Sequence, residues 1–174
     1  AASSPVRGFF MANGDAGNNQ NSDVDVVTIA SRGNSVKFGD MTHKRGQSAS
    51  FSNSTRAIQA CGSDGPSSRS TNTIDYISMS SDGTGIDFGD SPNSVSQLKT
   101  GAASQTRGCF AGGTTDGSDA INTINFIQIA TTGNAQDFGD CTIARYGRGS
   151  TTDCIRGVFA GGNGPALTNI MDYV

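Results

Sequence analysis

The sequence predicts an all-β protein made of repeated antiparallel sheets. Three observations lead to this fold class: a composition poor in helix formers, marker residues that recur about every 50 positions, and short apolar segments separated by turn-forming residues. Of the 174 residues, 24 are glycine and 34% are hydrophobic. All 15 acidic residues are aspartate, and leucine occurs only at Leu98 and Leu167. Because Leu and Glu favour helices, whereas Gly, Asp, Asn, Ser and Thr favour turns, caps and strands, the composition argues against helices.

Three markers recur in a fixed phase along the chain. Phe-Gly-Asp begins at residues 38, 88 and 138, an interval of 50 residues. A mostly hydrophobic segment of four residues recurs at residues 24–27, 74–77, 124–127 and 171–174. An arginine followed by a short apolar stretch recurs at Arg7, Arg56, Arg107 and Arg156. We therefore interpret residues 1–174 as a single repeat array, with periods 7–55, 56–106 and 107–155 and a partial period 156–174.

Each period is expected to contain four short strands. In the third period, the apolar segments predict strands at 107–111, 121–130, 136–139 and 144–152, with polar turns between them. Four strands in about 50 residues make one antiparallel blade, which must stack on neighbouring blades to bury its faces, as in a β-propeller. A propeller needs about 4 to 8 blades, and this chain offers three periods and part of a fourth. We therefore expect an incomplete ring, which a longer chain, other copies or stacking in a fibre would complete.

The repeated residues are expected to have structural roles. Phe38, Phe88 and Phe138 are predicted to fill the space between adjacent sheets, in preference to stacking on a ligand. A glycine pair, as in 112–113, would allow strands to approach closely or to bulge. The recurring charged residues predict either a repeated ion pair or arginine caps on backbone carbonyls between sheets. They are Arg7, Arg56, Arg107, Arg156, Asp40, Asp90 and Asp140.

Several classes of function are disfavoured. The net charge of −3 and the scattered Lys and Arg residues argue against nucleic-acid binding, and no apolar run approaches the roughly 20 residues of a membrane span. His43 is the single histidine, so we expect no resident metal, no cofactor and no catalytic site. Buried free thiols are the favoured interpretation of the cysteines, with one or two disulfides as the alternative. The cysteines are Cys61, Cys109, Cys141 and Cys154.

Polar loops after the glycine-rich strands interrupt the repetition. Their oxygen-bearing side chains are spaced as in calcium loops, although solvated hairpin turns are the favoured interpretation. Variable loops on a rigid scaffold often carry recognition surfaces, so these loops are the candidate sites of partner contact. The candidate residues are Asp15, Asn18, Asn19, Asp64, Asp116 and Asp119.

The chain resembles the kelch repeat family. The resemblance rests on the run 157–162 (GVFAGG), on the aromatic Phe126 about a dozen residues after a glycine pair, and on Arg145 after the next turn. The segments TIDYI, TTGNAQDFGD and TRGCFAGG are similar to kelch-like repeats in structural proteins of marine bacteriophages and other environmental viruses. The resemblance covers essentially the whole chain and implies four-stranded propeller blades. Two departures are the absence of tryptophan, whose place the Phe-Gly-Asp phenylalanines take, and degraded glycine pairs at 12–13 and 61–62.

The resemblance implies a non-catalytic structural or attachment protein of a phage virion, serving as a fibre, tail or decoration component assembled in the host cytoplasm. The expected partners are other virion or surface proteins, as a homo-oligomer or as a segment of a longer chain, with a host glycan as a candidate ligand. The alternative is an extracellular or cell-surface microbial adhesin or carbohydrate-binding module. Kelch blades serve unrelated tasks, so the fold alone does not distinguish these functions.

Overall fold

The computed structural model describes residues 1–11, 20–65, 69–81, 83–99, 101–116 and 119–174. These residues form strands and turns, with no helix among them, so the predicted all-β class is confirmed. Within the same residues there is accordingly no helix long and apolar enough to cross a membrane.

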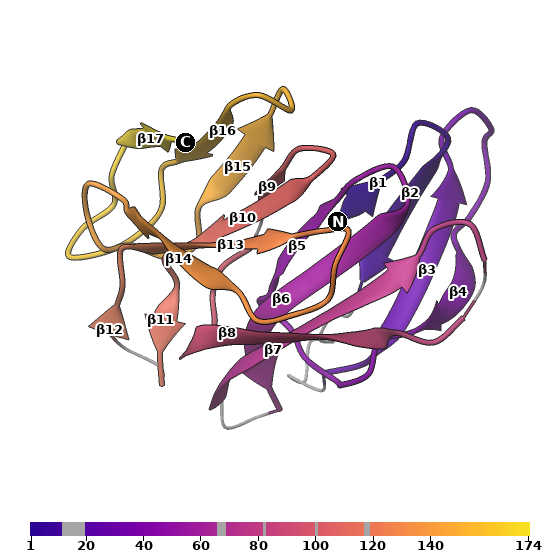
Figure 1. Cartoon of the computed structure of the whole chain (residues 1–174), viewed down its shortest axis with the longest axis horizontal. Helices are drawn as coiled ribbons and strands as arrows, with labels where there is room; N and C mark the ends of the chain where they lie inside the picture. Colours follow the sequence, from indigo (N-terminus) through magenta and orange to yellow (C-terminus); the bar gives the residue numbers. More distant parts are fainter. Residues whose placement is uncertain (12–19, 66–68, 82, 100, 117–118) are drawn as a thin grey trace.

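Small antiparallel sheets follow one another along the chain (Figure 1). The strand order is β1-β2-β3-β4 in the first sheet and β5-β6-β7-β8 in the second. The first sheet comprises β1 (Ala2–Ser3), β2 (Arg7–Met11), β3 (Asp23–Thr28) and β4 (Val36–Asp40). The second comprises β5 (Ala49–Ser52), β6 (Arg56–Asp64), β7 (Arg69–Ser78) and β8 (Ile86–Val95).

The third and fourth sheets repeat this order. The third comprises β9 (Ala102–Ala103), β10 (Arg107–Ala111), β13 (Thr123–Gln128) and β14 (Gln136–Asp140). The fourth comprises β15 (Gly149–Thr152), β16 (Gly157–Ala160) and β17 (Met171–Tyr173). A separate hairpin joins β11 (Thr114–Thr115) to β12 (Asp119–Ala120). The whole arrangement is a four-bladed β-propeller.

The sheets begin one strand earlier than the sequence periods. A short strand precedes each marker arginine and pairs with the strand that the arginine opens, as β9 pairs with β10 and β15 with β16. Of the strand expected at 144–152 as the fourth of the third period, only residues 149–152 form a strand, and this strand, β15, is the first of the next sheet. The reason is local: a tight turn of three or four residues before the arginine favours antiparallel pairing of its two flanking strands.

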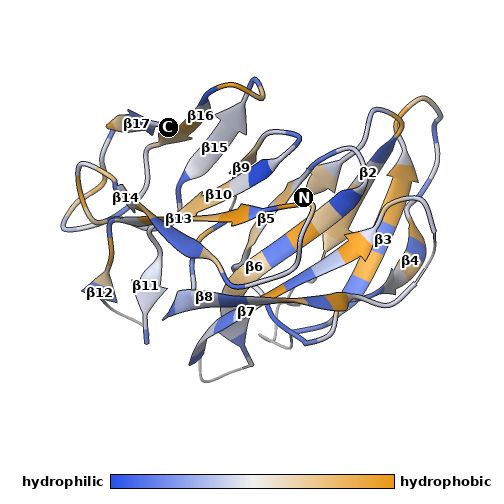
Figure 2. Cartoon of the chain, in the orientation of Figure 1, coloured by the Kyte–Doolittle hydropathy of each residue, from blue (hydrophilic) through white to orange (hydrophobic). Residues whose placement is uncertain are grey.

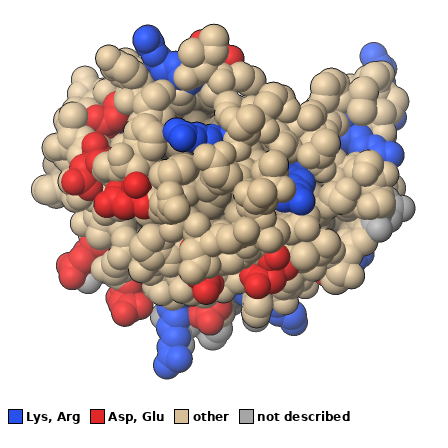
Figure 3. Space-filling view, in the orientation of Figure 1, with Lys and Arg blue, Asp and Glu red and all other residues tan. Residues whose placement is uncertain are grey.

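The four sheets surround one hollow. Residues of the innermost strands β1, β5, β9 and β15 line a single pocket, which places these strands around a common centre. The fourth sheet has three strands, and its outer edge is β17. In the described part of the chain, β17 pairs with β16 and with no strand of the first sheet. Figure 3 shows a notch in the upper edge of the molecule, on the side where the first and fourth sheets face each other in Figure 1.

The core lies between successive sheets. Hydrophobic residues concentrate on strands such as β3, whereas the connecting loops are mostly polar (Figure 2). One buried cluster joins Phe9 and Phe38 to Met79 of the second sheet, and a larger cluster joins Phe88 to Ile127 of the third. The cluster between the third and fourth sheets is smaller. Stacking of sheet on sheet therefore supplies the burial that one blade cannot achieve alone.

The three Phe-Gly-Asp phenylalanines are not equivalent. Phe38 and Phe88 are buried, with 6% and 3% of their surface exposed, but Phe138 is 46% exposed. The expectation of a buried ring is therefore wrong for Phe138. Met79 shares a cluster with Phe38, and Ile129 shares one with Phe88, whereas Phe138 belongs to none of the clusters of described residues.

Two of the four marker arginines, Arg7 and Arg56, cap carbonyls between sheets. Arg7 donates to the carbonyl of Met79 at 3.3 Å, and Arg56 donates to the carbonyl of Ile129 at 2.7 Å. The other alternative, an ion pair with the Phe-Gly-Asp aspartates, does not occur among the described residues, where Asp40 instead pairs with a lysine. The arginines also stack on aromatic rings, as Arg56 lies 4.4 Å from the ring centroid of Tyr76.

The buried ion pairs involve other residues. Arg45 lies 3.0 Å from the carboxylate of Asp75, and Arg145 pairs in the same way with Asp172. Burial alone would raise the pKa of Asp172, but hydrogen bonds from Thr142 and the nearby guanidinium of Arg145 hold the pKa below its ordinary value. Each pair connects the linker before a sheet to the third strand of that sheet.

Candidate functional site

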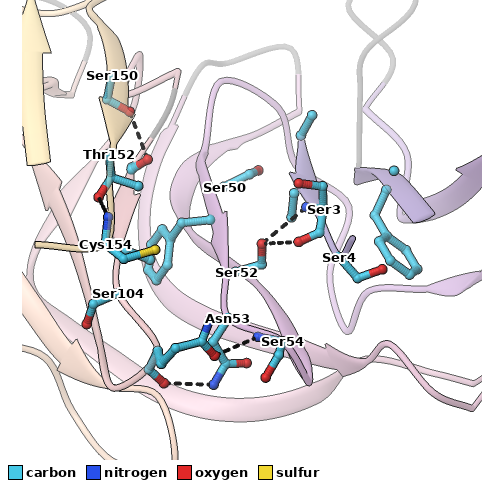
Figure 4. A pocket seen from close by; sticks show the side chains of 18 of the residues that line it. Ser3, Ser4, Ser50, Ser52, Asn53, Ser54, Ser104, Ser150, Thr152 and Cys154 are labelled. Atoms are coloured by element: carbon cyan, nitrogen blue, oxygen red, sulfur yellow. Dashed lines mark hydrogen bonds between the residues drawn. The ribbon is translucent and has the colours of Figure 1, made fainter. Parts of the chain in front are cut away.

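The hollow at the centre of the propeller is the candidate site to which all four sheets contribute. Its volume is about 680 Å³, within the range of small-molecule sites. Most of the lining comes from the innermost strand of every sheet and from the turn that follows it, and β2 adds Gly8, Phe9 and Phe10. Figure 4 shows side chains from these strands around the hollow, including Ser3, Ser52, Ser104 and Thr152.

Small side chains let the innermost strands converge. The sequence before each marker arginine is rich in serine, alanine and threonine, as in AASSPVR, SASFSNSTR, GAASQTR and GSTTDCIR. The strands also approach closely beside the hollow, because a Cβ atom added at Gly101 would lie 2.4 Å from the ring of Phe51. These serine-rich stretches are the sequence signal from which the hollow could have been predicted.

A repeated turn fixes the rim of the hollow. A side-chain oxygen three residues before each arginine accepts the backbone N–H of that arginine. The donor–acceptor distances are 3.1 Å at Ser4, 2.8 Å at Asn53, 3.1 Å at Ser104 and 2.7 Å at Asp153. At Asp153, the hydrogen bonds from the backbone of Arg156 and Ile155 lower the carboxyl pKa.

Hydrogen bonds across the hollow join each sheet to the next. One links the first sheet to the second, one the second to the third, and one the third to the fourth. They are Ser3 N to Ser52 Oγ at 3.1 Å, Asn53 Nδ2 to the Gln105 carbonyl at 3.1 Å, and Ser150 Oγ to the Gly101 carbonyl at 2.8 Å. These bonds hold the hydroxyl groups in place, and each hydroxyl oxygen retains capacity for a further hydrogen bond.

The lining combines polar groups with apolar side chains and carries no charged side chain. Among the described lining residues there is no Asp, Glu, Lys, Arg or His, and the polar groups are hydroxyls, amides and the thiol of Cys154. Three aromatic residues, Phe9, Phe10 and Phe51, also line the hollow; Phe10 is 49% exposed, whereas the other two are buried. This combination can form hydrogen bonds with hydroxyl groups and can contact an apolar ring face. It therefore suits an uncharged ligand rich in hydroxyl groups.

The loop residues nominated from the sequence lie elsewhere. Asp15, Asn18 and Asn19 fall outside the described residues. Asp64, Asp116 and Asp119 are exposed, and none of them lines the hollow. They belong to the β6–β7 and β11–β12 hairpins, which lie at the lower edge of the molecule in Figure 1.

The two hairpins are neighbours without forming a metal site. Ser70 Oγ donates to the carbonyl of Thr114 at 3.1 Å and so connects the second hairpin to the first. In the described part of the chain, no three metal-ligating side chains of His, Cys, Asp or Glu come together. The surface charges are also dispersed, because Lys and Arg residues do not gather into one patch on the face that Figure 3 shows.

The four cysteines are free thiols. Cys61, Cys109 and Cys141 are buried, whereas Cys154 is exposed at the rim of the hollow, contrary to the expectation that all four would be buried. Burial raises the pKa of the Cys61 thiol to about 12. The buried thiols therefore behave as small apolar side chains.

In comparisons with known proteins, no protein-family model matches the chain, and no curated protein has a significantly similar sequence.

Proposed function

We propose that this protein is a non-catalytic attachment module that binds a neutral glycan in the central hollow of its propeller. The observation that carries the proposal is a lining of hydroxyl and amide groups with no charged side chain, to which all four sheets contribute. A hydroxyl-rich ligand offers donors and acceptors that match such a lining, and an aromatic face beside them suits the apolar side of a sugar ring.

The lining also favours binding over catalysis. General acid–base chemistry and glycoside hydrolysis use carboxyl or imidazole groups beside the ligand. The described lining residues of the hollow offer neither, and the exposed thiol of Cys154 has no such group beside it in the lining.

The resemblance to kelch-like repeats suggests the assembly in which this module acts. We place this attachment module in a phage virion, as a fibre, tail or decoration component, because its repeat segments are similar to those of viral structural proteins. Fractionation of the source tests this setting. Co-purification with capsid or tail proteins supports it, whereas recovery in a secreted or cell-wall fraction supports the alternative of a microbial adhesin.

Titration with neutral oligosaccharides, followed by calorimetry or NMR, tests binding in the hollow. Thr151→Val keeps the shape of a lining side chain but removes its hydroxyl. We expect affinity to fall about two- to tenfold, the range that one hydrogen bond of about 0.5–1.5 kcal/mol provides. Thr84→Val is the matched control, because Thr84 is exposed outside the hollow. Equal affinities of the two variants, or binding only of charged saccharides, would contradict the proposal.

A further inference from the structure

Ser50 is the one buried polar residue among the described residues that line the central hollow. Only 6% of its surface is exposed, whereas the lining residues on the turns of the rim are exposed. These rim residues are Ser54, Gln105 and Cys154. Exposure therefore decreases from the turns toward Ser50, which places Ser50 at the floor of the hollow.

The hydroxyl of Ser50 has no hydrogen-bond partner among the described residues, and Figure 4 draws no hydrogen bond to it. Ser150 occupies the same place in the fourth sheet, and its hydroxyl donates to the carbonyl of Gly101 in the preceding sheet at 2.8 Å. The carbonyl that corresponds to Gly101 for Ser50 is that of Ala1, but Ser50 does not donate to it. Because nearly all buried polar groups in folded proteins are hydrogen-bonded, we expect this hydroxyl to bond to a group from outside the chain.

The next serine on the same face of β5 has a structural role. Side chains alternate along a strand, so Ser52 points to the same side as Ser50 and lies two residues nearer the rim. The Ser52 hydroxyl accepts the N–H of Ser3 at 3.1 Å and donates to the Ser3 carbonyl at 2.9 Å. Ser52 therefore joins the first two sheets, whereas the hydroxyl of Ser50 is available to a ligand.

The backbone holds Ser50 in a fixed position. Its carbonyl accepts the N–H of Gly101 at 3.3 Å, and β5 pairs with β6 at this residue, opposite Gln59. The Gln59 side chain is fully buried and donates to Ser48 Oγ at 2.7 Å. The corresponding residues of the other sheets are Phe10, Phe110 and Phe159. The second sheet thus has a polar side chain behind the floor where the other sheets have a phenylalanine, and it presents the Ser50 hydroxyl on a rigid strand.

We propose that Ser50 is a specificity-determining residue of the hollow, whose hydroxyl forms a direct hydrogen bond with one hydroxyl group of a neutral sugar. This inference rests on the proposed function. At the exposed rim, water replaces a lost sugar contact, but at the buried floor the loss of either hydroxyl leaves the other without a partner. The hollow therefore selects sugars with a hydroxyl group at one ring position and rejects the analogues that lack it, while it tolerates changes at positions that face the rim.

Alanine substitutions at the two serines of β5 distinguish a ligand-binding hydroxyl from a structural one. Ser50→Ala should leave the melting temperature unchanged or raise it, because the hydroxyl that it removes has no partner in the free protein. Ser52→Ala should lower the melting temperature, because it removes two hydrogen bonds between sheets. Thermal unfolding without ligand measures both. An equal fall for the two variants would show that Ser50 is structural and would overturn the proposal.

Titration with neutral trisaccharides of glucose, galactose and mannose, followed by calorimetry or NMR, measures the role of Ser50 in binding. For a trisaccharide that the unmodified protein binds, we expect Ser50→Ala to weaken affinity about tenfold to a hundredfold. Ser94→Ala is the matched control and should bind as the unmodified protein does, because Ser94 is exposed outside the hollow. Equal affinities of the two variants would overturn the role of Ser50 and leave the proposed function intact. If the unmodified protein binds none of the trisaccharides, the proposed function fails and this inference fails with it.

Monodeoxy derivatives of the bound trisaccharide identify the hydroxyl group that Ser50 contacts. One derivative should bind the unmodified protein about as weakly as the parent trisaccharide binds Ser50→Ala. The same derivative should bind Ser50→Ala with little further loss, because both changes delete the same hydrogen bond. If every derivative weakens binding to the two proteins by the same factor, a direct contact with Ser50 is refuted.

Discussion

The phenylalanine of the Phe-Gly-Asp motif is buried in one repeat and about half exposed in another. Phe88 is 3% exposed between the second and third sheets, whereas Phe138 is 46% exposed beside the fourth. The motif and its strand are the same in both places, as Phe-Gly-Asp lies at the outer strand of each sheet. The energetic value of the ring therefore depends on the sheet that packs against it.

Alanine substitution of these two phenylalanines should show that the stability each ring contributes depends on its burial and not on the motif. We expect Phe88→Ala to lower the free energy of unfolding by about 3–5 kcal/mol, because it removes a buried ring and leaves a cavity. Phe138→Ala should cost about 1 kcal/mol or less, as is usual for partly exposed positions. Urea unfolding measures both changes, and similar losses for the two variants would show that the ring of Phe138 is buried in solution.

At the scale of elements, one position before each sheet and one position in its third strand are either both charged or both uncharged. Arg45 pairs with Asp75 in the second sheet, and Arg145 pairs with Asp172 in the fourth. The corresponding residues for the third sheet are Val95, the last residue of β8, and Asn125 of β13, and both are buried and uncharged. The repeat thus accepts either a buried ion pair or a neutral combination, as expected if one buried charge without its partner is costly.

A double substitution that copies the third sheet into the second tests this coupling. Asp75→Asn alone should lower the free energy of unfolding by about 3–5 kcal/mol, because it leaves the Arg45 charge buried without its partner. The double variant Arg45→Val/Asp75→Asn should be more stable than Asp75→Asn. Asp23→Asn is the control: its ion pair with Lys37 is exposed, so the loss should be under about 1 kcal/mol. Additive losses in the double variant would contradict the coupling.

At the scale of the whole molecule, burial depends on contacts between sheets. Cys61 and Cys109 lie in different inter-sheet clusters, and Cys141 lies in the same cluster as Cys109. Exposure of these thiols therefore requires separation of sheets. Cys154 at the rim of the central hollow needs no such change.

Thiol labelling should report this difference without reductant. In the folded protein we expect Cys154 alone to react quickly, and after unfolding all four cysteines should react. Because the folded-state pKa of Cys61 is raised from 9.0 to about 12, its contribution to stability is present below pH 9 and is lost as pH rises toward 12. Mass spectrometry of the labelled protein identifies which cysteines have reacted in the folded state. Rapid labelling of Cys61 in the folded protein at pH 8 would contradict it.

The sequence by itself determined the all-β class, the repeat and the main strands of a period, such as those at 107–111, 121–130 and 136–139. These features follow from local properties: apolar alternation within a strand, turn-forming residues between strands, and the spacing of arginine and Phe-Gly-Asp. The strand that contains Phe138 could be predicted in this way, since β14 depends on residues within a few positions of it.

Only the tertiary structure decided how the strands are shared among sheets, where the hollow lies and which repeated residues are covered. Residues 149–152 belong to the fourth sheet because β15 pairs with β16, a choice that strand periodicity leaves open. Ser3, Ser52 and Ser150 line one hollow although about 50 to 150 residues separate them in the chain. Phe138 differs from Phe88 because its burial requires a neighbouring sheet to supply the covering side chain. The physical reason is that hydrogen-bonded turns act over a few residues, whereas packing joins surfaces that the fold brings together.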